Sequence, residues 1–236
     1  MKIHRFIGPF DTKSESQVLT DQEVVHQIVN VLKLGKGEQI IVGNGNGILS
    51  RCTISGHEKG KVFLENCKAE KVATESTAPV VLCLSLLKKD NFELAVQKAV
   101  EVGVESVIPL STERTVKQGF VRPRLEKIMK EASEQSGRAF VPTLEEPISL
   151  DSALFGANRK GTVIFCDGGS EYGSPSSVKV KGTSYVFVGP EGGWTDAERE
   201  MAREIGATFV SLAPTTLRAE TAAILASYLF TSYPQS

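Results

Sequence analysis

The amino-acid sequence predicts an α/β protein in two parts, a small β-barrel over residues 1–73 and an α/β domain over residues 74–236. Short strand-like segments with tight turns come first, a pattern typical of a small barrel. Residues 80–87 then form a continuous apolar run, as expected of a strand buried on both faces in a parallel sheet. After that run, strand-like and helix-like segments alternate to the end of the chain, which indicates an α/β domain.

The first part contains one predicted helix among several strands. Thr20-Asp21-Gln22-Glu23 is a capping-box pattern that opens an apolar-periodic helix over residues 24–32. Residues 43–47 (GNGNG) carry Asn-Gly pairs, which readily adopt positive φ and predict a tight hairpin. The strands expected in this part are residues 2–7, 39–42, 48–55 and 61–67.

The second part alternates between strands and helices with clear boundary residues. Asp90 is expected to cap a helix that ends at Gly103, and Pro123 suits the first turn of a helix over residues 124–137. Thr195 and Glu198 form a second capping box. Further strands are expected at residues 104–110, 162–166, 186–188 and 207–212, with a short helix from residue 149 and a final helix from residue 218.

Composition and charge exclude several classes of protein. No apolar run approaches the length of a membrane span and the amino terminus carries no apolar signal segment, so we expect a cytoplasmic protein without a membrane partner. The formal net charge of −1 argues against indiscriminate nucleic-acid binding. With three histidines and four scattered cysteines, no metal site is expected, and Cys52, Cys67, Cys83 and Cys166 are interpreted as buried reduced thiols.

Two strand-to-helix joints near the carboxyl terminus predict a ligand pocket. Residues 189–193 (GPEGG) follow one strand and residues 213–218 (APTTLR) follow the next, and the carboxyl edge of an open α/β sheet is where small ligands bind. The first loop matches neither the G-x-G-x-x-G template nor a Walker loop. Because Glu191 would repel phosphate, the pocket is expected to take a ligand without phosphate, one that fits better if it carries positive charge. A phosphate-handling nucleotidase is therefore the weakest alternative.

The chain resembles the bacterial 16S ribosomal RNA (uracil-N3) methyltransferases, the ribosomal RNA small subunit methyltransferase E family of the SPOUT superfamily, over nearly its whole length. The matching blocks, in order, are His4-Arg5-Phe6, Lys88-Lys89-Asp90, residues 98–104 (KAVEVGV), 109–114 (PLSTER), 131–138 (EASEQSGR), 189–193 (GPEGG) and 217–222 (LRAETA). The resemblance implies a PUA-like RNA-binding barrel over residues 1–73. It also implies a SPOUT domain with a deep trefoil knot over residues 74–236, and a homodimer with the active site between its subunits.

The resemblance further implies that S-adenosyl-L-methionine binds in the knot. The positions that match its binding loops are Phe165, Asp167, Gly168, Val188, Gly189, Pro190, Glu191, Gly192, Gly193, Leu212, Ala213, Thr216, Leu217 and Arg218. The third loop departs from the family pattern, because Ala213 stands where a glycine is usual and the Arg that usually follows is missing. Ala213 is therefore expected to adopt a backbone shape that glycine would take.

The substrate implied is a uridine near the 3′ end of 16S rRNA in the assembled small ribosomal subunit, methylated at N3. Arg138, Glu191 and Arg218 are the catalytic candidates: the arginines to steady negative charge or a phosphate, and Glu191 as base or cofactor-orienting group. A structural ion pair of Arg138 with Glu134 or Glu131 is the alternative. The residues expected to contact RNA are Arg5, Arg114, Lys117, Arg122, Arg124 and Arg138.

Three alternatives stay open at this point. The basic segment from Arg114 to Arg124 fits an RNA-backbone contact or a solvated surface with compensating pairs. The chain fits another SPOUT methyltransferase that acts on a different RNA position, such as a ribose hydroxyl. It also fits an RNA-binding assembly factor that keeps the fold without turnover.

Overall fold

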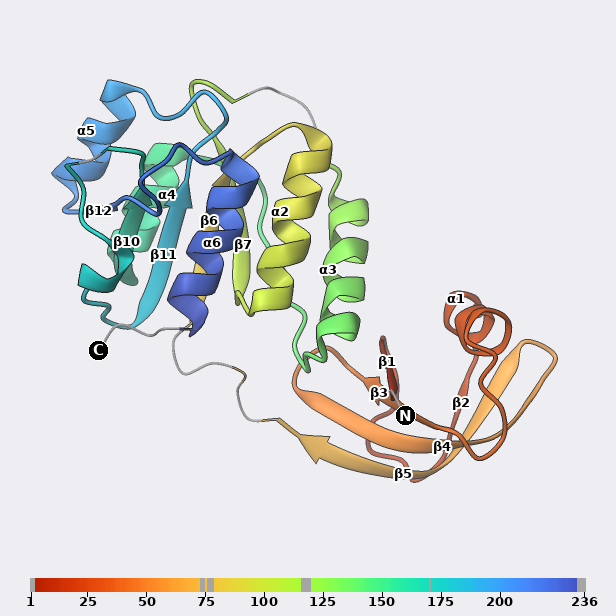
Figure 1. Ribbon diagram of the computed structural model, residues 1–236. Coiled ribbons are helices and arrows are strands. Elements are labelled where there is room, and N and C mark those ends of the chain that lie inside the picture. Colours follow the sequence, from red (N-terminus) through yellow and green to blue (C-terminus); the bar gives the residue numbers. More distant parts are fainter. Residues whose placement is uncertain (1–2, 73–74, 76–78, 116–119, 170, 233–236) are drawn as a thin grey trace. The chain divides into compact units, whose positions relative to one another are not determined.

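The computed structural model describes residues 3–72, 75, 79–115, 120–169 and 171–232, so the predicted RNA contact Lys117 lies outside the described residues. The chain divides into two compact units (Figure 1). Unit 1 comprises Met1–Glu75 and Ser133–Val141, and unit 2 comprises Ser76–Ala132 and Pro142–Ser236. Within the described residues no helix is both long and apolar enough to cross a membrane.

Unit 1 is built on a five-stranded sheet in the order β1-β3-β4-β5-β2. Its strands are β1 (His4–Ile7), β2 (Gln17–Leu19), β3 (Gln39–Gly43), β4 (Ile48–Glu58) and β5 (Lys61–Lys71). The hairpin predicted at the Asn-Gly pairs is confirmed, since β3 and β4 pair antiparallel and the Asn44 side chain accepts hydrogen bonds from the backbone N–H of Asn46 and of Ile48.

The predicted helix of unit 1 is present, but it begins one residue after the start that the capping pattern indicates and it is not regular. Helix α1 spans Gln22–His26 and continues as a π-helical turn over Gln27–Val31. The residue that caps it is Asp21 rather than Thr20, because the Asp21 carboxylate accepts from the backbone N–H of Glu23 and of Val24, both at 3.0 Å. The helix buries Val24 and Ile28 in the core of unit 1.

The prediction of four reduced thiols is wrong for two of the cysteines. Cys52 on β4 and Cys67 on β5 form a disulfide, with their Cα atoms 4.1 Å apart. The pairing of β4 with β5 shifts register between Arg51 and Thr53, and this bulge brings Cys52 opposite Cys67. A spacing of 15 residues in sequence does not reveal this contact, because it depends on the register of the hairpin. Cys83 and Cys166 are buried free thiols, as predicted.

Unit 2 contains a seven-stranded sheet among the described residues, with the main order β12-β10-β11-β6-β7-β8 and β9 paired with β7. All of these pairings are parallel, which confirms the expectation from the apolar run at residues 80–87. The strands are β6 (Val80–Ser85), β7 (Ser106–Ser111), β8 (Thr143–Leu144), β9 (Ile148–Ser149), β10 (Gly161–Cys166), β11 (Thr183–Val188) and β12 (Thr208–Val210).

Helices cover both faces of this sheet. Helix α6 (Ala219–Ser232) packs on β6 and β11 and against α2 (Lys89–Val102), while α4 (Leu150–Asn158) packs on β7 and β10 and against α5 (Asp196–Glu204) (Figure 1). The remaining helical segments are α3 (Arg122–Ser136) and a short 3₁₀ turn, Pro175–Ser177.

The ends of these helices follow the sequence signals with one exception. Gly103 closes α2 with φ of 110°, a conformation that glycine adopts without strain, and Thr195 and Glu198 form the predicted capping box. The exception is the start of α2, where Lys88 is the N-cap and Asp90 lies in the first turn.

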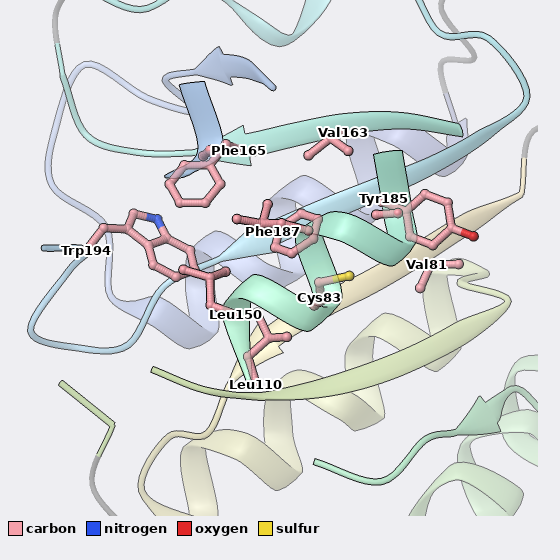
Figure 2. Close-up of a cluster of buried hydrophobic side chains, with 13 residues drawn as sticks. Val81, Cys83, Leu110, Leu150, Val163, Phe165, Tyr185, Phe187 and Trp194 are labelled. Carbon is pink, nitrogen blue, oxygen red and sulfur yellow. The ribbon is translucent and has the colours of Figure 1, made fainter. Parts of the chain in front are cut away.

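A cluster of aromatic and branched side chains forms the core between the sheet and α4. Phe165, Phe187 and Trp194 are at most 1% exposed, and the Phe165 and Trp194 rings lie with centroids 4.4 Å apart (Figure 2). Tyr185 lies at the other end of the cluster, and burial raises the pKa of its hydroxyl. Because Trp194 comes from the loop after β11, this core extends up to the carboxyl edge of the sheet.

Candidate functional site

A cavity of about 710 Å³ lies at the carboxyl ends of β10, β11 and β12 and at the amino-terminal ends of α2 and α6. This is the edge at which open parallel sheets bind ligands. The cavity is lined by Lys88, Asn91, Cys166, Asp167, Gly168, Val188, Gly189, Pro190, Glu191, Gly193, Trp194, Ser211, Leu212, Ala213, Thr215, Thr216, Leu217, Arg218, Ala219, Glu220 and Ala222.

The loop after β11 is held in place by Trp194. The Trp194 indole N–H donates to the Cys166 carbonyl at 3.0 Å, which joins this loop to the end of β10. A Cβ at position 189 would lie 2.9 Å from the indole ring, so only glycine fits there. Gly193 has φ of 68°, a conformation that side chains rarely adopt. The glycines therefore let the backbone turn tightly over a buried ring and line the cavity.

Two charged side chains brace the same loop from outside. Arg114 donates through Nη1 to the Gly192 carbonyl at 2.7 Å and to the Trp194 carbonyl at 3.3 Å. Glu198 accepts from the backbone N–H of Glu113 at 3.0 Å and from that of Thr195 at 2.8 Å. Segments that follow β7 and β11 are thus tied together, and Arg114, predicted to contact RNA, lies against the glycine loop.

The loop after β10 is held by an ion pair. The Asp167 carboxylate accepts from Arg199 Nε at 2.7 Å, and this contact raises the pKa of the Arg199 guanidinium. Burial raises the pKa of the neighbouring Cys166 thiol to about 12, with a smaller contribution from the Asp167 charge. Cys166 is therefore a neutral thiol at physiological pH rather than a nucleophile, although it lines the cavity.

The charged residues of the cavity lie on the loop after β11 and at the two helix starts. Glu191 accepts from the backbone N–H of Lys88 at 3.2 Å, which links the loop after β11 to the start of α2. The Arg218 side chain is 86% exposed, and its Nη1 lies 4.0 Å from Oε1 of Glu220. Glu220, by contrast, is nearly buried in the first turn of α6. The cavity wall therefore presents charges of both signs.

The loop after β12 is less enclosed, with residues 214–216 exposed. Ser211 donates through its backbone N–H to the Gly173 carbonyl at 2.9 Å and through its hydroxyl to the Ala213 carbonyl at 3.1 Å. Ala213 is not among the residues with positive φ. The expectation that it must adopt a glycine-like backbone is wrong, and alanine is unstrained there.

Twelve of the fourteen residues predicted to bind a cofactor line this cavity. The exceptions are Phe165, whose ring is fully buried in the core, and Gly192, whose carbonyl faces Arg114. Sequence reasoning left out Lys88, Asn91 and Ser211, and it did not assign a ligand role to Trp194 or Glu220. Lys88 lies in a block on which the resemblance rests and Trp194 directly follows the glycine loop, so both carried a usable signal.

The catalytic candidate Arg138 belongs to unit 1, where its side chain is 10% exposed. Its Nε donates to Glu75 at 2.7 Å, so Glu75 is an ion-pair partner that the sequence did not indicate. Glu75 also accepts from the backbone N–H of Ala139 and of Phe140. The Arg138 carbonyl in turn accepts from Arg5 Nη1 at 3.0 Å, and burial lowers the pKa of Arg5. These contacts fix the chain that follows α3.

Two further residues predicted to contact RNA, Arg122 and Arg124, also make ion pairs. Arg122 donates to Glu146 at 2.6 Å and to Glu126 at 3.0 Å. Arg124 forms a two-point pair with Glu93, at 2.5 and 2.7 Å, which holds the pKa of the Glu93 carboxyl below its ordinary value. No cluster of His, Cys, Asp and Glu that suits a metal ion occurs within the described part of the chain.

Comparison with known proteins identifies the family. The RNA methyltransferase domain matches residues 74–231, and the RNA methyltransferase PUA domain matches residues 19–65. Ribosomal RNA small subunit methyltransferase E of Bacillus subtilis is 33% identical over 86% of this chain and 85% of its own length. The chain belongs to the ribosomal RNA small subunit methyltransferase E family. The family member of Synechocystis is 29% identical over 90% of this chain and 72% of its own length.

Solved structures of the family share the fold over nearly the whole chain. Ribosomal RNA small subunit methyltransferase E of Neisseria gonorrhoeae, bound to S-adenosyl methionine, superposes with a TM-score of 0.85 at 28% identity and covers 98% of both chains. A Legionella pneumophila protein in complex with the cofactor SAM superposes with a TM-score of 0.86 at 26% identity, again over 98% of both chains. The α/β fold with an amino-terminal PUA-like domain is thereby confirmed.

Proposed function

We propose that this protein transfers a methyl group from S-adenosyl-L-methionine to N3 of a uridine near the 3′ end of 16S rRNA in the small ribosomal subunit. The observation that carries the proposal is the cavity at the carboxyl edge of the unit 2 sheet, built from the loops after β10, β11 and β12. Membership in the ribosomal RNA small subunit methyltransferase E family supports the substrate, and relatives solved with S-adenosyl methionine support the cofactor.

The residues of the cavity fit this cofactor chemically. A volume of about 710 Å³ suits a ligand the size of a nucleoside joined to an amino acid. Gly189 and Gly193 allow close approach of the backbone, while Leu212, Ala213 and Leu217 provide apolar surface for a base. Glu191 and Glu220 disfavour phosphate groups and suit a ligand that carries positive charge.

S-adenosylmethionine supplies a methyl group already activated by its sulfonium. The protein then has to align the target nitrogen and favour loss of its proton, because a neutral imide nitrogen has no available lone pair. Arg218, which is exposed and lines the cavity, is the candidate to steady the negative charge that develops on the uracil oxygens. Glu191, in the same wall, is the candidate to accept the N3 proton or to orient the cofactor.

Arg138 remains a candidate for contact with the target nucleotide or its phosphate, although Glu75 holds its guanidinium. Arg5, Arg114, Arg122, Arg124 and Lys117 remain candidates for contact with the RNA backbone. Backbone contacts by Lys and Arg make affinity fall steeply as salt rises. Full turnover and unchanged RNA affinity in Arg138→Ala would remove Arg138 from the proposal.

The assembly proposed is a homodimer in the cytoplasm, with the active site between subunits and the cofactor loops arranged as a trefoil knot. Helix α6 supports a subunit contact, because it is rich in apolar residues and Tyr228 is 43% exposed on it. A knotted α/β domain and a dimer are also what the family resemblance implies.

Methyl transfer to unmodified small ribosomal subunits tests the proposal. Labelled S-adenosylmethionine is supplied, and the product nucleoside is identified by mass spectrometry. A single 3-methyluridine near the 3′ end of 16S rRNA is the expected result. If the label is found on another nucleotide or on a ribose hydroxyl, the proposed target atom is wrong and the protein methylates a different RNA position. If there is neither methyl transfer nor cofactor binding, the result favours an RNA-binding assembly factor without turnover.

A further inference from the structure

Glu220 is a buried acidic residue at the wall of the cavity that none of the proposed catalytic steps uses. It is 7% exposed overall, and its Oε2 is buried without a hydrogen-bond partner. The other oxygen, Oε1, lies 4.0 Å from Nη1 of Arg218, which is beyond hydrogen-bond distance. Since Arg218 is 86% exposed, its charge is screened by solvent and does little to compensate the buried oxygen.

Native proteins seldom leave a buried carboxylate oxygen without a donor, because the loss of hydration is costly. The position of Glu220 in the first turn of α6 offers partial compensation, since the amino-terminal end of a helix favours negative charge. That effect provides no hydrogen bond for Oε2. A cationic donor that enters the cavity that Glu220 lines would hydrogen-bond this carboxylate and offset its negative charge.

The distribution of charge around the cavity indicates which part of a ligand would donate a hydrogen bond to Glu220. The loop after β12 contributes Leu212, Ala213 and Leu217, which suit an uncharged ring. Glu220, Arg218 and Lys88, at the starts of α6 and α2, are charged. A wall with both signs suits a zwitterion, whose ammonium donates to a carboxylate while its carboxylate faces a cationic side chain such as Lys88.

We propose that Glu220 accepts a hydrogen bond from the α-ammonium group of the amino-acid part of S-adenosylmethionine, and that it is thereby a positioning residue for the cofactor. The inference rests on the proposed cofactor, and it adds the residue that recognises the amino-acid part of that cofactor. The sulfonium is the other cationic group of the ligand, but it has no N–H or O–H, so it cannot donate a hydrogen bond to the Glu220 carboxylate.

Calorimetric binding of three ligands to the full-length protein tests the assignment. S-adenosylmethionine and S-adenosylhomocysteine both carry the ammonium, whereas 5′-methylthioadenosine lacks the amino-acid part, and only the first carries the sulfonium. Glu220→Gln is expected to lower the affinity for S-adenosylmethionine and for S-adenosylhomocysteine by the same factor, roughly 10- to 100-fold, as for the loss of a hydrogen bond between charged groups. Binding of 5′-methylthioadenosine is expected to stay unchanged.

Thermal unfolding of the ligand-free variants separates recognition from a structural role. Because Oε2 has no partner, Glu220→Gln is expected to unfold at the same or a higher temperature than the parent protein. Ser227→Ala is the matched control: it removes another buried, unpartnered oxygen from α6, at a residue that does not line the cavity, and should bind all three ligands normally.

The outcomes distinguish this inference from the function on which it rests. If Glu220→Gln loses affinity equally for all three ligands, or if it unfolds at a lower temperature but binds normally, the proposed role of Glu220 is wrong. Weakening of S-adenosylmethionine alone would assign the carboxylate to the sulfonium and also overturn the proposal. Failure of the parent protein to bind any of the three ligands would instead overturn the proposed function.

Discussion

The loops after β11 and after β12 both line the cavity, yet they are held very differently. The loop after β11 is anchored by the buried Trp194, by Arg114 and by the capping box of α5. The loop after β12 exposes residues 214–216, and its Ser211 hydroxyl makes a local hydrogen bond to Ala213. The loop after β11 is therefore ordered by protein contacts before a ligand binds, whereas the loop after β12 is expected to become more ordered when a ligand binds.

The difference follows from the core beneath each loop. Trp194 packs on Phe165 inside the cluster between the sheet and α4, so the glycine loop is an extension of that core (Figure 2). In the loop after β12, the buried residues begin at Ala219, at the start of α6. Preorganised contacts reduce the entropy cost of binding, so the first loop is expected to set the shape of the site.

The largest effect is expected from Trp194→Ala, because it removes a fully buried aromatic side chain. The free energy of unfolding should fall by about 3–5 kcal/mol, as measured by denaturant titration, and cofactor binding should be lost. Trp194→Phe keeps a ring but loses the hydrogen bond to the Cys166 carbonyl, at a cost of about 1 kcal/mol. A loss below 1 kcal/mol in Trp194→Ala would show that the loop does not depend on this anchor.

Arg114→Ala is expected to weaken S-adenosylmethionine binding about tenfold, since it removes two hydrogen bonds to loop carbonyls. If Arg114 acts only on the loop, RNA affinity should depend on salt concentration with the same slope in Arg114→Ala as in the parent protein. If Arg114 contacts a phosphate, as the sequence predicts, the slope should become shallower by about one unit with cofactor affinity unchanged. Arg114→Lys, which keeps the charge, controls for the loss of charge.

Glu198→Ala is expected to lower the free energy of unfolding by about 1–2 kcal/mol, because Glu198 accepts from the backbone N–H of Glu113 and of Thr195. Glu200→Ala, on the same helix with an exposed pair to Arg203, should change stability by less than about 0.5 kcal/mol. Equal effects from the two variants in chemical denaturation would argue against the capping box as a brace.

The smallest effect is expected from Ala213→Gly in the loop after β12. Because Ala213 does not have positive φ, glycine relieves no strain and only adds freedom to the unfolded chain, so stability should fall by less than about 1 kcal/mol. Cofactor affinity, measured by calorimetry, should change little. A marked gain in affinity would show that the family glycine is needed in this loop after all.

Features of the fold that depend on local sequence could be predicted from it. The capping box at Thr195 and Glu198 and the glycine end of α2 follow from residue types at fixed spacings, and both are present. The continuous apolar run that becomes β6 correctly indicated a buried parallel strand. The position of the cavity followed from two strand-to-helix joints, which is also a local pattern.

Features that depend on contacts between distant segments could not be predicted. The disulfide depends on a bulge in the pairing of β4 with β5, and the contact of Arg114 with Gly192 depends on where two loops meet in space. Glu75 lies 63 residues from Arg138, so no helical spacing pointed to their ion pair. The burial of Glu220 could not be inferred either, because its helix turn looks like an ordinary polar start.

Hydrogen exchange with and without S-adenosylmethionine tests most directly whether this cavity is the cofactor site and whether its two walls differ. Protection is expected to rise most over residues 211–218 and less over residues 189–195, which are already braced without ligand. The amide of Gly193, hydrogen-bonded to the Pro190 carbonyl at 2.9 Å, should be protected in both states. Protection confined to segments that do not line the cavity, or a larger gain in the loop after β11, would contradict the account.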